Sequence, residues 1–283
     1  MRSLVGGLIA LMCVVNPPQA SAQSDLPPAR WELALAVQTG IPGGDVKVGE
    51  FTFRGTRLRL HEDLGVDLSK AVELRVGYHL TPRDTLQFSF QTLFLDGTTT
   101  LRDDVSFNGA TLAGGTTLRT RPQFYRASLA YEHTLLPLGE GGRLAGSVGL
   151  TYVHLDFRLQ GTLAANSPGT ETKEDFWKQE LPVPLVGLRA DYPLTDHLGL
   201  TASLAAGYLP WLDSLRSEGG EPVKLTQAHT DASLGLSYAL TPALSVEGGY
   251  RYTYFFQHEK NREDDNRFLL SDHAVVLGFA YRF

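Results

Sequence analysis

The sequence predicts an all-β protein whose antiparallel strands form a closed transmembrane β-barrel of about 10 strands, with 8 or 12 as the alternatives. Three features of the 283-residue chain lead to this fold class: an N-terminal export segment, a two-residue alternation of side-chain character, and short connections that alternate with long ones. Period two is the repeat of a β-strand. Apolar side chains that alternate with small or polar ones are typical of a strand with lipid on one side and a barrel interior on the other.

The first 22 residues have the pattern of a secretory signal peptide. Arg2 supplies a positive charge, residues 3–15 are almost entirely apolar, and two prolines then end the apolar stretch. The small-x-small pattern that ends at Ala22 is a cleavage site of the kind that signal peptidase recognises. We therefore expect a cleaved signal peptide over 1–22 and a barrel domain over 23–283.

Composition excludes several classes of protein and of site. The only cysteine, Cys13, lies in the export segment, so we expect no disulfide and no thiolate metal site in the barrel. A lipoprotein signal needs a small residue before the cysteine, and Met12 does not fit, so we expect no lipidation. The net charge is −6 and no basic patch stands out, so nucleic acid is not an expected partner. No apolar run of 18 residues follows residue 22, which leaves a closed barrel as the way to span a membrane. No cofactor or metal is expected.

The alternation is clearest in the last segment. One face of this predicted strand carries Leu269, Ser271, His273, Val275, Leu277, Phe279, Tyr281 and Phe283. The opposite face carries Asp272, Ala274, Val276, Gly278, Ala280 and Arg282. The same pattern recurs in residues 31–38, 72–79, 86–91, 125–132, 200–208 and 246–254. A secreted β-sandwich would also alternate, but its bulky face would be buried and its outer face polar, so the small opposite face favours the membrane barrel.

The connections predict the strand count. Three segments, which begin at Tyr78, Tyr192 and Tyr238, share the pattern Tyr-x-Leu-Thr, and a Gly- and Pro-rich fourth connection spans Leu135 to Gly142. These four short turns pair eight strands, and one strand at each chain end makes ten. Longer polar connections are expected at 40–70, 103–116, 161–179, 210–224 and 257–268. Whether 40–70 adds spanning strands stays open, because Phe51 to Leu60 has strand character.

The inward-facing charges form the main candidate network. The alternation directs eleven charged side chains into the lumen: Glu73, Arg75, Arg126, Glu132, Arg189, Asp191, Asp231, Glu247, Arg251, Asp272 and Arg282. Six acids and five bases are nearly balanced, and buried charges persist when they are paired. We expect a plug of salt bridges rather than an ion-selective pore, which would carry an excess of one sign.

At the C-terminus, Phe279-Ala-Tyr281-Arg-Phe283 resembles the terminal signature of Gram-negative outer-membrane barrels. The resemblance implies location in the cell outer membrane, contact with membrane lipid and lipopolysaccharide, and an assembly signal, formed by Phe279, Tyr281 and Phe283, that the barrel-assembly machinery reads. The segment from Gly55 to Asp67 also resembles small uncharacterised proteobacterial barrels, and this second resemblance implies no function.

Ser271 and His273 are the first candidates for catalysis, on the lipid face of the last strand. A Ser/His pair at this level is where a lipid A deacylase would act. The order Ser-x-His is the reverse of the His-x-Ser that we associate with that family, and no carboxylate completes the set. Polar residues at the headgroup level are the simpler interpretation.

His229 and Asp231 are the second candidates. They resemble the acid/His pair of omptin proteases, which are also ten-stranded, but their order is reversed and Asp103-Asp104 are the only further acids available. Because of these differences, no acid/His pair can be assigned to activate a water molecule.

Three acidic clusters fall in the predicted loops: Glu62-Asp63, Glu171 to Asp175, and Glu263 to Asp265. They could gather divalent cations that bridge lipopolysaccharide, but none has the spacing of a calcium loop, so a solvated loop surface is the simpler interpretation. We therefore expect a structural, small-solute (porin-like) or surface-interaction barrel, with a barrel enzyme of the deacylase or omptin kind as the alternative.

Overall fold

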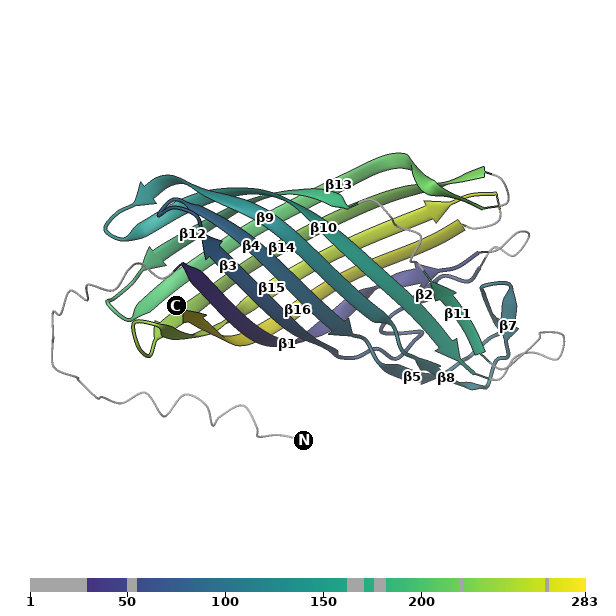
Figure 1. The fold of residues 1–283 in the computed structure, drawn as a ribbon. Coiled ribbons are helices and arrows are strands. Elements are labelled where there is room, and N and C mark those ends of the chain that lie inside the picture. Colours follow the sequence, from purple (N-terminus) through teal and green to yellow (C-terminus); the bar gives the residue numbers. More distant parts are fainter. Residues whose placement is uncertain (1–29, 50–54, 162–170, 176–181, 219–220, 263–264) are drawn as a thin grey trace, which may run out of the picture.

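The computed structural model describes residues 30–49, 55–161, 171–175, 182–218, 221–262 and 265–283. The predicted signal peptide over 1–22 lies outside this part of the chain. Within it, ten long antiparallel strands close into one barrel (Figure 1). These strands are β1 (Trp31–Lys47), β3 (Ser69–His79), β4 (Asp84–Phe94), β9 (Gln123–Leu138), β10 (Gly142–Gln160), β12 (Val183–Pro193), β13 (Leu198–Glu218), β14 (Glu221–Ala239), β15 (Leu244–Lys260) and β16 (Asp265–Arg282).

Closure joins the two ends of the chain. β1 pairs with β16 from Glu32↔Arg282 to Lys47↔Arg267, and the amide of Trp31 donates a 2.9 Å hydrogen bond to the carbonyl of Phe283. Every other pair of neighbours in the barrel is consecutive among the ten strands, which gives a simple up-and-down order. The predicted closed ten-stranded barrel is therefore confirmed.

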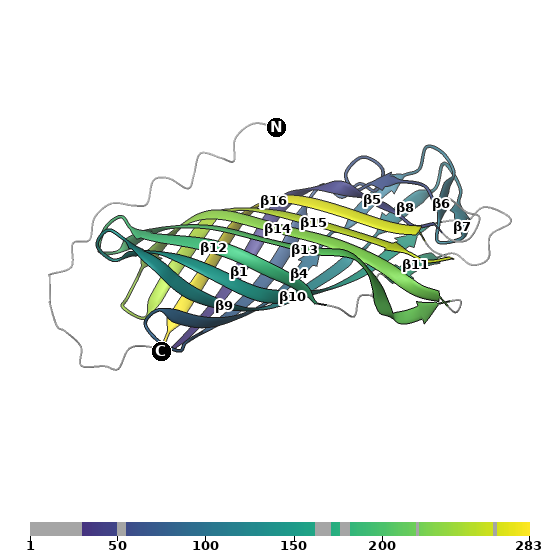
Figure 2. The same cartoon turned by 90° about the horizontal axis from the view of Figure 1, so that it is seen from above.

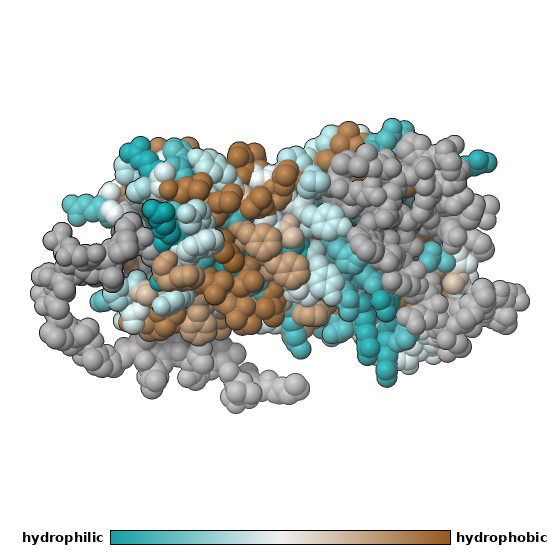
Figure 3. Space-filling model, viewed as in Figure 1, coloured by the Kyte–Doolittle hydropathy of each residue, from teal (hydrophilic) through white to brown (hydrophobic). Residues whose placement is uncertain are grey.

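An apolar belt surrounds the half of the barrel that lies nearer to the four short turns. Bulky side chains point outward from all ten strands, among them Leu35, Phe88, Val186, Leu234 and Phe279, which are 41–64 % exposed. Figure 3 shows this belt as a brown band, with hydrophilic surface toward the opposite end of the barrel. Exposed apolar surface of this extent is the mark of a lipid-facing wall. Among the described residues, no helix is long and apolar enough to span a bilayer.

The repeated Tyr-x-Leu-Thr segments form one turn built three times. The amides of Leu80, Leu194 and Leu240 donate to the carbonyl four residues later, at 2.9, 2.8 and 2.9 Å. The hydroxyls of Thr195 and Thr241 each accept a hydrogen bond from the amide three residues later, both at 3.0 Å. Leucine therefore lies at the rim of the belt while threonine satisfies the turn amides.

The opposite, loop end differs from the sequence prediction. Residues 210–224 and 257–268 were expected to be polar loops, but most of them extend the β13–β14 and β15–β16 hairpins. Figure 2 shows these strands running on well past the shorter ones. The described part of 40–70 adds no spanning strand: it contains the end of β1, the two-residue β2 (Leu58–Arg59) that pairs with β1, and the start of β3.

Short strands lie at the loop end. β5 (Gly97–Thr100) pairs with β8 (Thr117–Thr120), which also pairs with β10, and a small hairpin of β6 (Val105–Phe107) and β7 (Ala110–Leu112) lies between them in the chain. β11 (Glu171–Asp175) pairs with β10.

The loop end of the lumen is filled by an apolar core. Inward side chains of the strands and of the loops after β1 and β4 build one buried cluster, whose largest members are Phe107, Phe124, Phe157, Phe255 and Phe268. Gly65 has a φ of +66°, and a Cβ there would lie 2.4 Å from the carbonyl oxygen of Thr98. A side chain at that position would push the loop away from the core.

Candidate functional site

The middle of the lumen contains two arginines, each paired with a carboxylate. Arg251 Nη1 lies 2.7 Å from Glu73 Oε2, and Arg126 Nη1 lies 2.6 Å from Asp231 Oδ2. Both pairs join strands that are not neighbours in the sheet, so each crosses the lumen. Such pairs tie together strands that the sheet does not pair directly and place charge inside the lumen.

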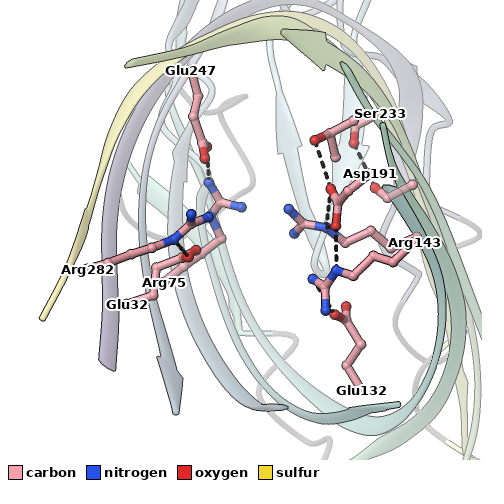
Figure 4. Close-up of polar contacts among 11 residues, drawn as sticks. Glu32, Arg75, Glu132, Arg143, Asp191, Ser233, Glu247 and Arg282 are labelled. Atoms are coloured by element: carbon pink, nitrogen blue, oxygen red, sulfur yellow. Dashed lines mark hydrogen bonds and ion pairs between the residues drawn. The ribbon is translucent and has the colours of Figure 1, made fainter. Parts of the chain in front are cut away.

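Nearer the turn end, two further pairs lie close together, and one of them joins β3 and β15, as the Arg251–Glu73 pair does. Arg75 Nη2 lies 2.5 Å from Glu247 Oε2, and Arg282 Nε lies 2.7 Å from Glu32 Oε2. Figure 4 shows these four side chains grouped together, with Arg75 reaching toward Glu247. The second pair ties β16 to β1 where the barrel closes.

The facing wall carries a branched network. Arg143 lies 3.0 Å from both Glu132 and Asp191, and Arg189 lies 3.0 Å from Asp191. The hydroxyl of Thr201 donates to Asp191 at 2.9 Å. In Figure 4 this group faces the Arg75–Glu247 group across the barrel.

Ten of the eleven sequence-predicted lumen charges take part in these ion pairs. Asp272 does not: it accepts a 2.7 Å hydrogen bond from the hydroxyl of Ser69. The prediction omitted Glu32 and Arg143. Glu32 alternates with outward Trp31 and Leu33, so the sequence pattern could have identified it as an inward residue. Arg143 directly follows a turn, where too few residues alternate to show which way its side chain points.

The space left beside the ion pairs is small. A cavity of about 80 Å³ is bordered by Arg75, Arg189, Arg251, Glu247 and several glycines and serines. Its volume corresponds to a few water molecules, because one water needs roughly 10–15 Å³ on this measure. The residual space is therefore a pocket for water or a very small solute.

Beside the apolar core, β14 and β15 contribute a polar chain. His229 Nε2 and Gln227 Oε1 are 3.1 Å apart, Gln227 Nε2 donates to Gln257 at 2.6 Å, and Gln257 donates to Glu259. All four side chains are buried. This chain satisfies polar groups that would otherwise face the aromatic core.

The structure does not bring the second catalytic candidates together as a water-activating pair. Asp231 accepts hydrogen bonds from Arg126 and from the hydroxyl of Thr253, the latter at 2.9 Å. His229 is 2 % exposed and packs edge-on against Phe255, with ring centroids 4.8 Å apart. Both side chains are therefore engaged in the interior of the barrel.

The acidic partners considered for that pair lie in a loop. Asp104 accepts a 2.8 Å hydrogen bond from the amide of Gly114, and Asp103 is exposed beside it. They belong to the segment around β6 and β7 rather than to the wall that carries His229.

The first catalytic candidates lie on the outer face, as the alternation predicted. His273 is exposed, and its Nδ1 lies 2.6 Å from the hydroxyl of Tyr250. The cross-strand neighbours of Ser271 are Gly43 and Tyr254. Among the described residues, no carboxylate forms a hydrogen bond or ion pair with His273 that would make a Ser-His-acid set.

The acidic clusters are partly described. Asp63 accepts from the backbone amide of Arg59 at 2.9 Å and from its guanidinium at 3.1 Å. Burial opposes ionisation, but these bonds hold the pKa of Asp63 below its ordinary value. Residues 263–264 lie outside the described chain. Within it, no three His, Cys, Asp or Glu residues are grouped as a metal site.

The three residues of the proposed assembly signal point to lipid. Phe279, Tyr281 and Phe283 are 58 %, 49 % and 59 % exposed. The rings of Tyr281 and Phe283 stack with centroids 5.7 Å apart. The last strand thus presents an aromatic edge at the turn end of the belt.

A groove lies at the loop end. Its volume is about 750 Å³, and Asp67, Asp96, Arg119 and Arg121 line it together with small and threonine residues. Ligand sites commonly have volumes of roughly 300–1,000 Å³, so the groove has the size of a binding site.

Comparisons with known proteins agree on the architecture. The sequence profile of the family described as outer membrane protein beta-barrel domain matches residues 8–283. A search of curated proteins gives no match. Solved structures with a similar fold include the outer membrane protease OmpT from Escherichia coli, with 13 % identity, 93 % of this chain and 100 % of that chain covered, and a TM-score of 0.51.

Two further similar structures score lower. The translocator domain of the autotransporter NalP from Neisseria meningitidis has 15 % identity, covers 89 % of this chain and 88 % of that one, and has a TM-score of 0.44. The toluene transporter TodX from P. putida has 12 % identity, covers 91 % of each chain, and has a TM-score of 0.37.

Proposed function

Because this chain belongs to the outer membrane protein beta-barrel domain family, we propose that it is a closed, non-conducting barrel of the outer membrane whose function lies at its loop-end surface. One observation carries the proposal: the lumen is obstructed twice, by cross-lumen ion pairs in its middle and by an apolar core at the loop end. In barrels of this family the long-loop end faces outward from the cell.

Each obstruction is sufficient by itself. Ion pairs across the axis resist opening, because separating them would leave a confined charge without a partner. The apolar core excludes hydrated solutes, because a solute that entered would have to lose its water without gaining polar contacts. Barrels of eight strands are filled, and aqueous channels appear at sixteen, so ten strands favour closure.

The loop end offers the surface that such a role needs. The β13–β14 and β15–β16 hairpins extend this end beyond the belt, and the groove beside Asp67 and Arg119 has both signs of charge. A ligand with both charged and hydrogen-bonding groups would fit that lining. Insertion of the protein by the barrel-assembly machinery, through Phe279, Tyr281 and Phe283, is part of the same proposal.

Single-channel recording in planar bilayers tests the closed lumen. We expect the wild-type protein to show no steady conductance. One matched variant replaces residues 101–116 by Asn-Gly, since the β5–β8 ladder ends at Thr100↔Thr117 and a two-residue turn can join it. Another carries Arg126→Ala and Arg251→Ala.

Each variant removes part of one obstruction, so each should stay closed, whereas the combination should conduct. Conductance by the combined variant would demonstrate that the protein inserts and that the recording detects an open lumen. A large steady conductance from the wild-type protein would show that transport through the lumen is its function, and the proposal would be wrong.

A further inference from the structure

Basic side chains gather on the outer wall of four adjacent strands at the loop end. In the strand register, Arg267 of β16 neighbours Lys47 of β1 and His258 of β15. One step nearer the loop tips, Lys260 of β15 neighbours Lys224 of β14. We call Lys47, Lys224, His258, Lys260 and Arg267 the basic strip.

Three cations of the strip are available for a ligand. Within the described chain, no carboxylate forms an ion pair with Lys224, Lys260 or Arg267, and Lys224 and Lys260 are exposed. The guanidinium of Arg267 lies over the ring of Phe256, 5.3 Å from its centroid, and its Nε has no hydrogen-bond partner. The aromatic ring thus holds an unpaired cation flat against the wall.

Among the described side chains, two carboxylates lie beside the strip and do not neutralise it. Asp265 lies 2.8 Å from both Lys47 and His258, and Asp213 is the cross-strand partner of Lys224 without an ion pair between them. The four Lys and Arg side chains exceed these two acids by two charges, in a protein whose net charge is −6. The excess is therefore local.

The height of the strip places it just above the belt. Fourteen residues of β16 separate Tyr281, at the turn end of the belt, from Arg267. With a rise of about 3.4 Å per residue and a tilt of about 40°, Arg267 stands about 36 Å above Tyr281. The apolar band of such barrels is about 25 Å tall, so Arg267 lies about 10 Å beyond it, at the level of lipid headgroups.

Aromatic side chains occupy the wall between the strip and the turns. Tyr250 and Tyr208 are 46 % and 59 % exposed, and Tyr252 packs on His273 with ring centroids 4.9 Å apart. Acyl chains can lie along such a wall while anionic groups of the same molecule reach the cations above it.

From this arrangement we propose that the basic strip binds the phosphate groups of a multiply acylated, phosphorylated glycolipid of the outer leaflet, that is, lipopolysaccharide. A soluble polyanion would use the cations but not the aromatic wall below them, and a neutral lipid would use only the wall. The combination fits a molecule that carries both phosphate and several acyl chains. The site lies on the outer face and is independent of whether the lumen is closed.

Binding to the folded barrel in a non-ionic detergent tests this proposal. The probes are bisphosphorylated lipid A, the same lipid without phosphates, and inorganic phosphate. Trp211 packs on His258 with ring centroids 4.9 Å apart, so its fluorescence is a local reporter of binding. The variant carries Lys224→Ala, Lys260→Ala and Arg267→Ala, and the matched control carries Lys70→Ala, Arg102→Ala and Arg158→Ala, which remove three exposed cations elsewhere.

We expect bisphosphorylated lipid A to bind the wild type and the control variant with Kd values within about twofold. The strip variant should bind at least about tenfold more weakly, because each basic residue near an anionic lipid contributes about a fivefold change. Removal of the phosphates from the lipid should cause a similar loss.

Three results would overturn the proposal. Equal affinity of the strip variant and the wild type would show that the cations do not bind the lipid. An equal loss in the control variant would show that only net charge matters. Binding of inorganic phosphate as tightly as lipid A would indicate a site for a small anion. Unchanged slow migration of heated protein and fast migration of unheated protein should show that all variants are folded.

Discussion

The two halves of the barrel have opposite distributions of polar and apolar side chains. Toward the turns, the wall is apolar outside and charged inside, and the interior is held by ion pairs such as Arg251–Glu73. Toward the loops, the wall is polar outside, with Lys260 and Arg267, and apolar inside, with Phe255 and Phe268. The first half faces acyl chains and the second lies beyond them, so the long strands reverse their polarity as they leave the apolar belt.

The reversal explains how one barrel can have a lipid-facing wall in one half and, in the other half, an apolar core like that of a water-soluble protein. Above the belt no lipid is available to cover apolar side chains, so the strands direct them inward, where the hydrophobic effect stabilises them as in a water-soluble protein. Below it, the interior is the place where polar groups can find partners. The four predictions below test this difference, beginning with the largest expected effect.

A carboxylate introduced into each half should distinguish them most strongly. Phe268→Asp places a charge in the apolar core, where it would have no partner, and we expect loss of the folded barrel. Ser233→Asp is the matched change beside the cavity that Arg75, Arg189 and Arg251 border, and this variant should fold. Heat-modifiable migration on a gel is the measurement; folding of both variants to the same extent would contradict the difference between the halves.

Removal of one ring from the core should have the next largest effect. Phe255 is fully buried against Phe124 and Phe268, with centroids 5.0 and 5.9 Å away. Phe255→Ala should lower the free energy of unfolding by about 3–5 kcal/mol. Phe88→Ala removes the same ring from the lipid face, where detergent fills the space, and it serves as the control. Urea titration in detergent measures both, and equal losses would argue against a packed core.

Much of the fold could be predicted from the sequence. The errors in the predicted strands and loops fall in the loop half of the barrel, beyond the apolar belt. Alternation with an apolar outer face predicted the spanning strands and the inward charges from Glu73 to Arg282. It failed at 210–224 and 257–268, because polar residues such as Lys224 and Arg267 face outward there and suggest loops, while inward residues such as Val223 and Phe268 are buried.

The candidate sites divide in a similar way. A pair within one strand, such as His229 and Asp231, is visible in the sequence, but its partners come from other strands. Arg126 of β9 lies 105 residues away from Asp231 along the chain, and no local pattern connects them. The basic strip is likewise assembled from four strands, which is why no basic patch stood out in the linear sequence.

A single ion pair of the turn half should matter less than a core ring. Arg251→Ala leaves Glu73 without its 2.7 Å partner, but water in the adjacent cavity can solvate the carboxylate in part. We expect the free energy of unfolding to fall by about 1.5–3 kcal/mol, less than the roughly 3–5 kcal/mol for removing one partner of a fully dry ion pair. Combining Arg251→Ala with Glu73→Gln should recover part of the loss. A double variant no more stable than Arg251→Ala would show that the two charges act independently.

The smallest effect is expected at the turn rim, where a charge is neither in the lumen nor in lipid. Asp84 accepts hydrogen bonds from the hydroxyls of Thr81 and Tyr131, and its Oδ1 lies 2.7 Å from His133 Nδ1. The Thr81 bond above all, then those from Tyr131 and His133, hold the pKa of Asp84 well below its ordinary value of 3.8.

Because the folded-state pKa of Asp84 is lowered, its contribution to stability is fully present above the unfolded pKa. That contribution is lost as the pH falls through the folded-state value. The group is exposed, so we expect its loss to lower the unfolding temperature by no more than about 2 °C. Asp84→Asn should remove the contribution of Asp84 to the fall in unfolding temperature at low pH and leave the remaining pH dependence unchanged. Thermal unfolding of both proteins in detergent, at pH 6 and again near pH 2, measures the difference. A drop on acidification that is equally large in the Asn variant would show that the rim carboxylate contributes nothing and that the acid sensitivity of the barrel arises in its lumen.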